Sequence, residues 1–150
     1  MFEMTEETLA EVKSQMGPCG IACGGCELGN GTVAAKALDL KNSIEMYGIR
    51  EWAPMVPGGS EIDFDQLFKN LEWVNTYSRC LGCEEGGGPP DCTIRKCAND
   101  KGYDLCSKCS ELEECKKFEW LGDYSTTLKQ KLIESKGKSK REIIEEALAN

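Results

Sequence analysis

The pattern of apolar and polar residues along the chain predicts helices and little strand. In several stretches apolar side chains recur three and four residues apart, a spacing that places them on one face of a helix. These stretches lie at about 5–16, 32–47, 63–77, 111–120 and 125–148. We therefore expect a mainly α protein.

The helix at 63–77 is the best defined of these. Asp63 and Gln66 have the spacing of a capping box, in which two side chains satisfy free backbone N–H groups at the start of a helix. The apolar residues that follow are spaced for one helix face, and we expect them in the core: Phe64, Leu67, Phe68, Leu71 and Val74.

Capping signals also mark the other predicted helices. Thr5 can cap the first helix, since a threonine oxygen accepts from a free N–H of the first turn. The capping-box spacing recurs at Ser110 and Glu113, before the short helix. It recurs again at Ser139 and Glu142, before the amphipathic C-terminal stretch.

The segment 80–115 has a different composition. It contains seven of the ten cysteines and the run EEGGGPPD, but few large apolar residues. Metal coordination can supply folding free energy where burial cannot. A chain of 150 residues fits one domain. The predicted fold is thus a single, mainly α domain, residues 1–150, with irregular metal-stabilised loops and zinc-knuckle-like cysteine turns; a small α+β arrangement stays open.

The N-terminus and the hydropathy indicate a cytoplasmic protein. The run MFEMTEETLAEVKS has no basic start followed by an apolar stretch, so it does not resemble a secretory signal. No run of about 18 apolar residues is present, and no membrane association is expected. In a reducing compartment, clustered cysteines are more often metal ligands or catalytic thiols than disulfides.

The charge disfavours nucleic acid as a partner. The formal net charge is -8 at pH 7, and each zinc ion bound by four thiolates would make it more negative. Affinity for nucleic acid comes largely from neutralising phosphates with basic side chains. Another protein remains as an expected partner.

Three pairs of cysteines have the spacing C-x2-C: Cys23 with Cys26, Cys80 with Cys83, and Cys106 with Cys109. Two intervening residues allow a tight turn to aim both sulfurs at one ion about 2.3 Å away. Three such pairs in one cytoplasmic chain indicate metal sites.

The remaining later cysteines are single. Five residues on a helix span about 500°, so Cys92 and Cys97 cannot share an ion from one helix face. We expect Cys92 before a helix, Cys97 within it and Gly102 at its end. Cys115 would likewise present one sulfur. All three are candidate ligands.

The chain has no histidine. A cysteine and histidine hydrolase is therefore excluded, and the sequence offers no catalytic residues. Metal sites must be all-thiolate or completed by carboxylates, which favours structural zinc or an iron–sulfur cluster over catalytic zinc.

The N-terminal cysteines also match two motifs that the rest of the chain does not support. Cys19, Cys23 and Cys26 have the C-x3-C-x2-C spacing of radical S-adenosylmethionine enzymes. The mostly helical pattern leaves no room for the barrel that those enzymes need. The run CGGC lacks the preceding strand and flanking tryptophan of a thioredoxin-like motif.

Turn geometry suggests which thiols share an ion. The 80/83 and 106/109 pairs can approach one another across a compact connection. Cys19, Cys23 and Cys26 would then take Cys115 as a fourth ligand. A sequential site of residues 80, 83, 92 and 97 is the alternative.

The order of the cysteine motifs resembles a known family. CGIACGGC, CLGC, CTIRKCANDKG and LCSKC, with Cys115 six residues later, are similar to the pattern of domain of unknown function 3795. Order and spacing agree at all ten cysteines. Some members have a further cysteine where this chain has GGGPP. The resemblance implies zinc binding and implies no particular activity.

The sequence thus supports three functional hypotheses. The first is a small zinc-binding protein, with two structural all-thiolate sites, that acts as an interaction or regulatory module. The second is an iron–sulfur electron-transfer protein, with eight of the ten cysteines on two clusters. The third is thiol redox chemistry or metal handling by cysteines outside such sites.

Overall fold

The computed structural model describes residues 5–149, which are mainly helical and include no β-strand. A single bridge of antiparallel type joins Met16 and Ala22. The mainly α prediction is confirmed. No helix within residues 5–149 combines the length and the apolar character needed to cross a membrane.

Residues 5–149 divide into two compact units. Gly31–Arg79 form one, which we call the hairpin unit. The segments on either side of it form the other, which we call the cysteine unit because all ten cysteines lie in it.

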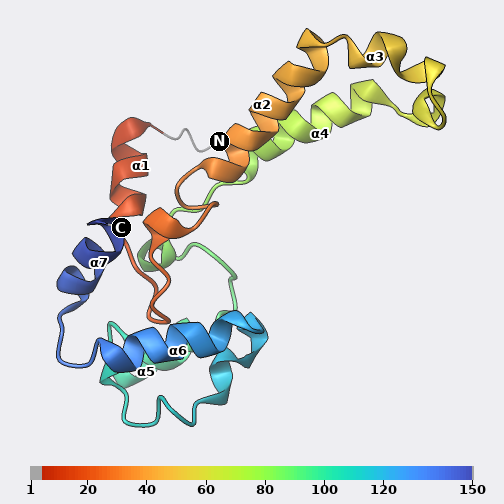
Figure 1. The fold of residues 1–150 in the computed structure, drawn as a ribbon. Helices are drawn as coiled ribbons and strands as arrows, with labels where there is room; N and C mark the ends of the chain where they lie inside the picture. Colours follow the sequence, from red (N-terminus) through yellow and green to blue (C-terminus); the bar gives the residue numbers. More distant parts are fainter. Residues whose placement is uncertain (1–4, 150) are drawn as a thin grey trace. The chain divides into compact units, whose positions relative to one another are not determined.

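The hairpin unit consists of two long helices and a short connection. Its elements are α2 (Thr32–Met46), α3 (Ile49–Trp52), the 3-10 turns Ala53–Met55 and Gly59–Glu61, and α4 (Phe64–Tyr77). Helices α2 and α4 pack along one another and run antiparallel (Figure 1). Asn75 Nδ2 donates to the Ala34 carbonyl at 2.8 Å, and Lys41 and Glu72 form an ion pair at 3.1 Å.

Both hairpin helices lie where the sequence places them, but their apolar faces are less covered than expected. Asp63 Oδ1 accepts from the Gln66 N–H at 3.0 Å, while the Gln66 side chain binds Asn70. No residue of α4 is fully buried. The side chains expected in the core are only half-buried, because a two-helix unit offers each helix one packing partner: Phe64, Leu67, Phe68, Leu71 and Val74.

The cysteine unit has shorter helices joined by tight turns. Its elements are α1 (Glu6–Lys13), η1 (Cys23–Gly25), η4 (Cys83–Glu85), α5 (Thr93–Lys101), η5 (Cys106–Lys108), η6 (Lys116–Leu121), α6 (Tyr124–Glu134) and α7 (Lys140–Ala149). They surround one buried cluster of Met16, Cys19, Ile94, Leu105, Leu112, Phe118, Leu128 and Leu132.

The structure corrects the last predicted helix, at 125–148. It is two helices, α6 and α7. The chain turns between them at Gly137, whose φ of +90° suits only glycine. Ser139 and Glu142 then form the expected capping box, with bonds of 2.8 and 3.2 Å.

Two other predicted helices are shorter than expected. The first ends at Lys13 rather than near residue 16. The predicted helix at 111–120 begins only at Lys116, and it is a 3-10 helix. Before it, Leu112 N–H bonds to Cys109 O at 3.4 Å and Cys115 N–H to Leu112 O at 3.2 Å. Leu112, in these tight turns, is buried in the core.

The buried cluster predicts which substitutions weaken the cysteine unit. Leu128 is 1% exposed, so Leu128→Ala should lower the free energy of unfolding by about 2–5 kcal/mol. Leu148 is 51% exposed, and Leu148→Ala should cost less than about 1 kcal/mol. Urea unfolding measures both. Equal losses would contradict the assignment of the core.

Candidate functional site

Four thiols from two distant segments gather near the N-terminal turn; we call Cys19, Cys23, Cys80 and Cys83 the knuckle group. The Cys23 and Cys83 side chains are hydrogen-bonded to each other. This bond lowers the pKa of Cys23 to about 6 and raises that of Cys83. A Cβ added to Gly17 would lie 3.2 Å from the Cys83 sulfur and 3.4 Å from the Cys19 sulfur.

The turn at Cys80 is built from glycines that approach its sulfur closely. The Gly82 N–H donates to the Cys80 sulfur at 3.4 Å. Gly82 has φ +94°, a conformation that L side chains rarely adopt. A Cβ on Gly87 would lie 2.6 Å from the Cys80 sulfur. The glycines therefore let the backbone fold closely around this sulfur.

Gln15 fastens this turn to the N-terminal segment. Its side chain is buried, and its Nε2 donates to the Leu81 carbonyl at 2.9 Å. Its Oε1 accepts from the Glu84 N–H at 3.1 Å. The sequence reasoning missed Gln15, since a single glutamine in a short loop carries no motif.

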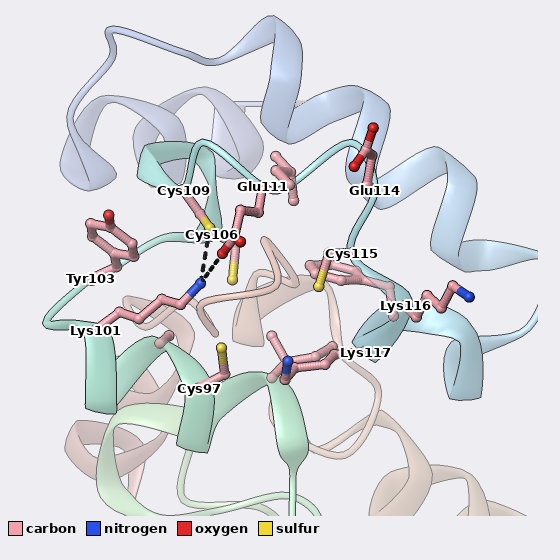
Figure 2. Close-up of a pocket in the computed structure, with 14 residues that line it drawn as sticks. Cys97, Lys101, Tyr103, Cys106, Cys109, Glu111, Glu114, Cys115, Lys116 and Lys117 are labelled. Atoms are coloured by element: carbon pink, nitrogen blue, oxygen red, sulfur yellow. Dashed lines mark hydrogen bonds and ion pairs between the residues drawn. The ribbon is translucent and has the colours of Figure 1, made fainter.

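A second set of four thiols lines a cavity; we call Cys97, Cys106, Cys109 and Cys115 the cavity group. The cavity has a volume of about 290 Å³. Figure 2 shows the sulfurs approaching this space from α5, from the turn η5 and from the chain just before η6. The Cys106 N–H donates to the Pro18 carbonyl at 2.9 Å, which ties η5 to the N-terminal segment.

Apolar residues form the inner wall of the cavity and lysines lie at its rim. The wall comprises four buried side chains, Ile94, Ala98, Leu112 and Phe118. The lysines in its lining are Lys101, Lys116 and Lys117.

Lys101 links a thiol to a carboxylate at this rim. Its Nζ lies 3.7 Å from the Cys109 sulfur and 2.6 Å from Glu111 Oε2 (Figure 2). The hydrogen bond that Lys101 donates to Glu111 raises the pKa of Lys101, and the nearby thiols raise it further. Lys101 therefore keeps a positive charge beside the cavity group.

Burial raises the pKa of the Cys106 thiol to about 12, and the neighbouring cysteines add to the shift. The thiol is thus protonated near neutral pH. A cation in the cavity would favour the thiolate instead, because an opposite charge stabilises the ionised form.

The structure groups the cysteines differently from the expected pairing. Cys106 and Cys109 share the cavity with Cys97 and Cys115, and neither Cys80 nor Cys83 lines it. The sequential alternative is also divided, since Cys97 is in the cavity group while residues 80 and 83 are in the knuckle group. This grouping follows from the tertiary structure, in which α5 and η5 line the same cavity.

Cys26 lies outside both groups. Cys26 closes the η1 turn through its N–H bond to Cys23 O at 3.2 Å. Cys92 occupies the N-cap position of α5 without a side-chain capping bond, with Cys97 inside the helix and Gly102 at its end, as the spacing predicts. Burial raises the pKa of Cys19, and the nearby Cys92 adds to this shift. None of the ten cysteines forms a disulfide. Within residues 5–149, no three cysteine, aspartate or glutamate side chains are placed to hold a metal ion as they stand.

The buried contacts of Gln15 predict a measurable effect on stability. Gln15→Ala leaves the Leu81 carbonyl and Glu84 N–H without their partner and should lower the free energy of unfolding by about 1–3 kcal/mol. Gln15→Glu should also destabilise, because a carboxylate cannot donate to Leu81.

Gln130→Ala is the matched control, since Gln130 is exposed and bonds only to Glu134 among the hydrogen bonds described. It should change stability by less than about 0.5 kcal/mol. Chemical unfolding measures all three variants. A Gln15→Ala protein as stable as the control would contradict the role of Gln15.

The comparisons with known proteins identify a family and nothing closer. No curated protein and no solved structure matches the chain. A family model described as "Protein of unknown function (DUF3795)" matches residues 15–120, which include all ten cysteines. The resemblance seen in the cysteine spacing is confirmed, and the chain belongs to the DUF3795 family.

Proposed function

We propose that this protein binds metal through its thiols and that the metal holds the cysteine-rich turns onto the helical core. The observation that carries the proposal is the gathering of eight of the ten cysteines into two groups of four in one unit. Soft thiolate ligands suit zinc, copper(I) and iron–sulfur clusters.

The knuckle group is the proposed zinc site. Structural zinc sites commonly bind the ion through four cysteine sulfurs, and this group supplies four. The Gly82 N–H already donates a hydrogen bond to the Cys80 sulfur. The Cys23 and Cys83 sulfurs are in hydrogen-bond contact, so two donors start close together. Zinc binding would replace the hydrogen bond of this pair and draw the other two sulfurs inward.

The proposed biological role is that of an interaction or regulatory module. In the hairpin unit, Met46, Tyr47, Met55 and Trp73 are all more than half exposed. Exposed apolar side chains in such numbers are typical of protein contact surfaces. Another protein is therefore the proposed partner. A reducing compartment such as the cytoplasm suits the ten free thiols.

Metal counting on single variants tests the zinc site. The protein purified without chelators should contain zinc, and Cys83→Ser should lose the zinc of the knuckle group. Cys26→Ser is the matched control and should retain it, because Cys26 belongs to neither group. Elemental analysis of the purified proteins gives the stoichiometry.

Removal of this zinc should also lower the free energy of unfolding by several kcal/mol, because binding energy at a structural site is folding energy. Thermal melts before and after chelation check this. An unchanged melting curve after verified removal, or a protein that binds no metal, would refute the proposal.

A further inference from the structure

We propose that the cavity group holds an iron–sulfur cluster rather than a single zinc ion. The inference rests on the proposed function, since it requires these thiols to bind metal. It concerns Cys97, Cys106, Cys109 and Cys115, which the cavity brings together.

The size of the space favours a cluster. Zinc holds its four sulfurs about 2.3 Å from one centre, so a closed zinc site leaves no room between them. The cavity instead has a volume of about 290 Å³, roughly ten times the volume that a water molecule occupies in the liquid. A set of iron and sulfide ions has room in such a space.

The spacing of the thiols points the same way. The four sulfurs line one cavity but approach it from three separate parts of the chain, α5, η5 and the residue just before η6. In a cluster each cysteine binds a different iron or shares an iron with one other. The four thiolates therefore do not need to converge on one point.

The surroundings of the cavity suit a cluster in charge and in polarity. Four thiolates and their sulfides carry negative charge, and the lining has three lysines, Lys101, Lys116 and Lys117, against the two glutamates Glu111 and Glu114. Lys101 already reaches the Cys109 sulfur at 3.7 Å. The inner wall is apolar and buried, which limits access of water to the cluster. Hydrogen bonds to the cluster sulfurs and burial of the cluster from solvent are among the main factors that set its reduction potential.

Binding needs no oxidant or reductant if the cluster arrives assembled. Each cysteine thiol gives its proton to a thiolate that leaves the incoming cluster, and its sulfur takes the vacated bond to iron. Four such exchanges transfer the cluster, and no electron moves.

Anaerobic purification followed by iron, acid-labile sulfide and zinc analysis tests the inference. The protein should contain iron and sulfide in equal amounts, and it should absorb visible light. If it is isolated without iron, anaerobic incubation with a preassembled cluster bound by small thiolates should load it to the same level. Cys97→Ser and Cys106→Ser should each lose most of the iron and sulfide, while Cys26→Ser should retain both.

Variants of Lys101 test the same placement of the cluster even if a cysteine variant fails to fold. Lys101→Gln should keep the cluster but lower its reduction potential, because a positive charge near the cluster favours the reduced state. Lys101→Arg should restore the potential. The control is Lys138→Gln, since Lys138 pairs with Glu146 away from the cavity and should leave the potential unchanged.

The outcomes separate this inference from the proposed function. Zinc in the cavity group, lost from Cys106→Ser, would overturn the cluster and leave the metal-binding function intact. Iron that survives in Cys106→Ser but not in Cys83→Ser would overturn the placement in the cavity. A protein that binds neither zinc nor a cluster would overturn both.

Discussion

The packing of one small set of apolar side chains supports everything else in the cysteine unit. Phe118, Leu128 and Leu132 come from the C-terminal half, and Met16 comes from the segment before the first cysteine turn. Cys19 is part of the same cluster, and Cys92, Cys106 and Cys115 pack against it. The cysteine turns have few large apolar residues of their own, so their positions depend on this core.

The two thiol groups differ in what lies between their sulfurs. In the knuckle group a direct hydrogen bond joins Cys23 and Cys83, and Gln15 fixes the adjoining turn. In the cavity group the sulfurs surround open space that lysines border. The first arrangement suits one compact ion and the second a larger inorganic group. One chain can thus combine a structural site with a site of different chemistry.

The hairpin unit has a small packing surface, and this limits how many of its side chains are buried. Its two long helices cover each other along one side only, so α4 has no fully buried residue. The segments of the cysteine unit on either side of the hairpin unit are joined, because the Cys80 N–H donates to the Leu28 carbonyl at 3.3 Å. The chain therefore leaves and re-enters the cysteine unit through neighbouring residues.

The sequence by itself determined the helical class, the positions of α2, α4 and α5, and the ten candidate ligands, because helix periodicity, capping and C-x2-C turns are local. It placed a helix start at Ser139 but did not predict the turn at Gly137, where the chain needs a positive φ. Nor did it predict that Cys97 and Cys115 join Cys106 and Cys109, or that Gln15 holds the Cys80 turn. Only the tertiary structure decided these three features. Each depends on which segments the buried core brings together, and the spacing of residues along the chain does not determine that.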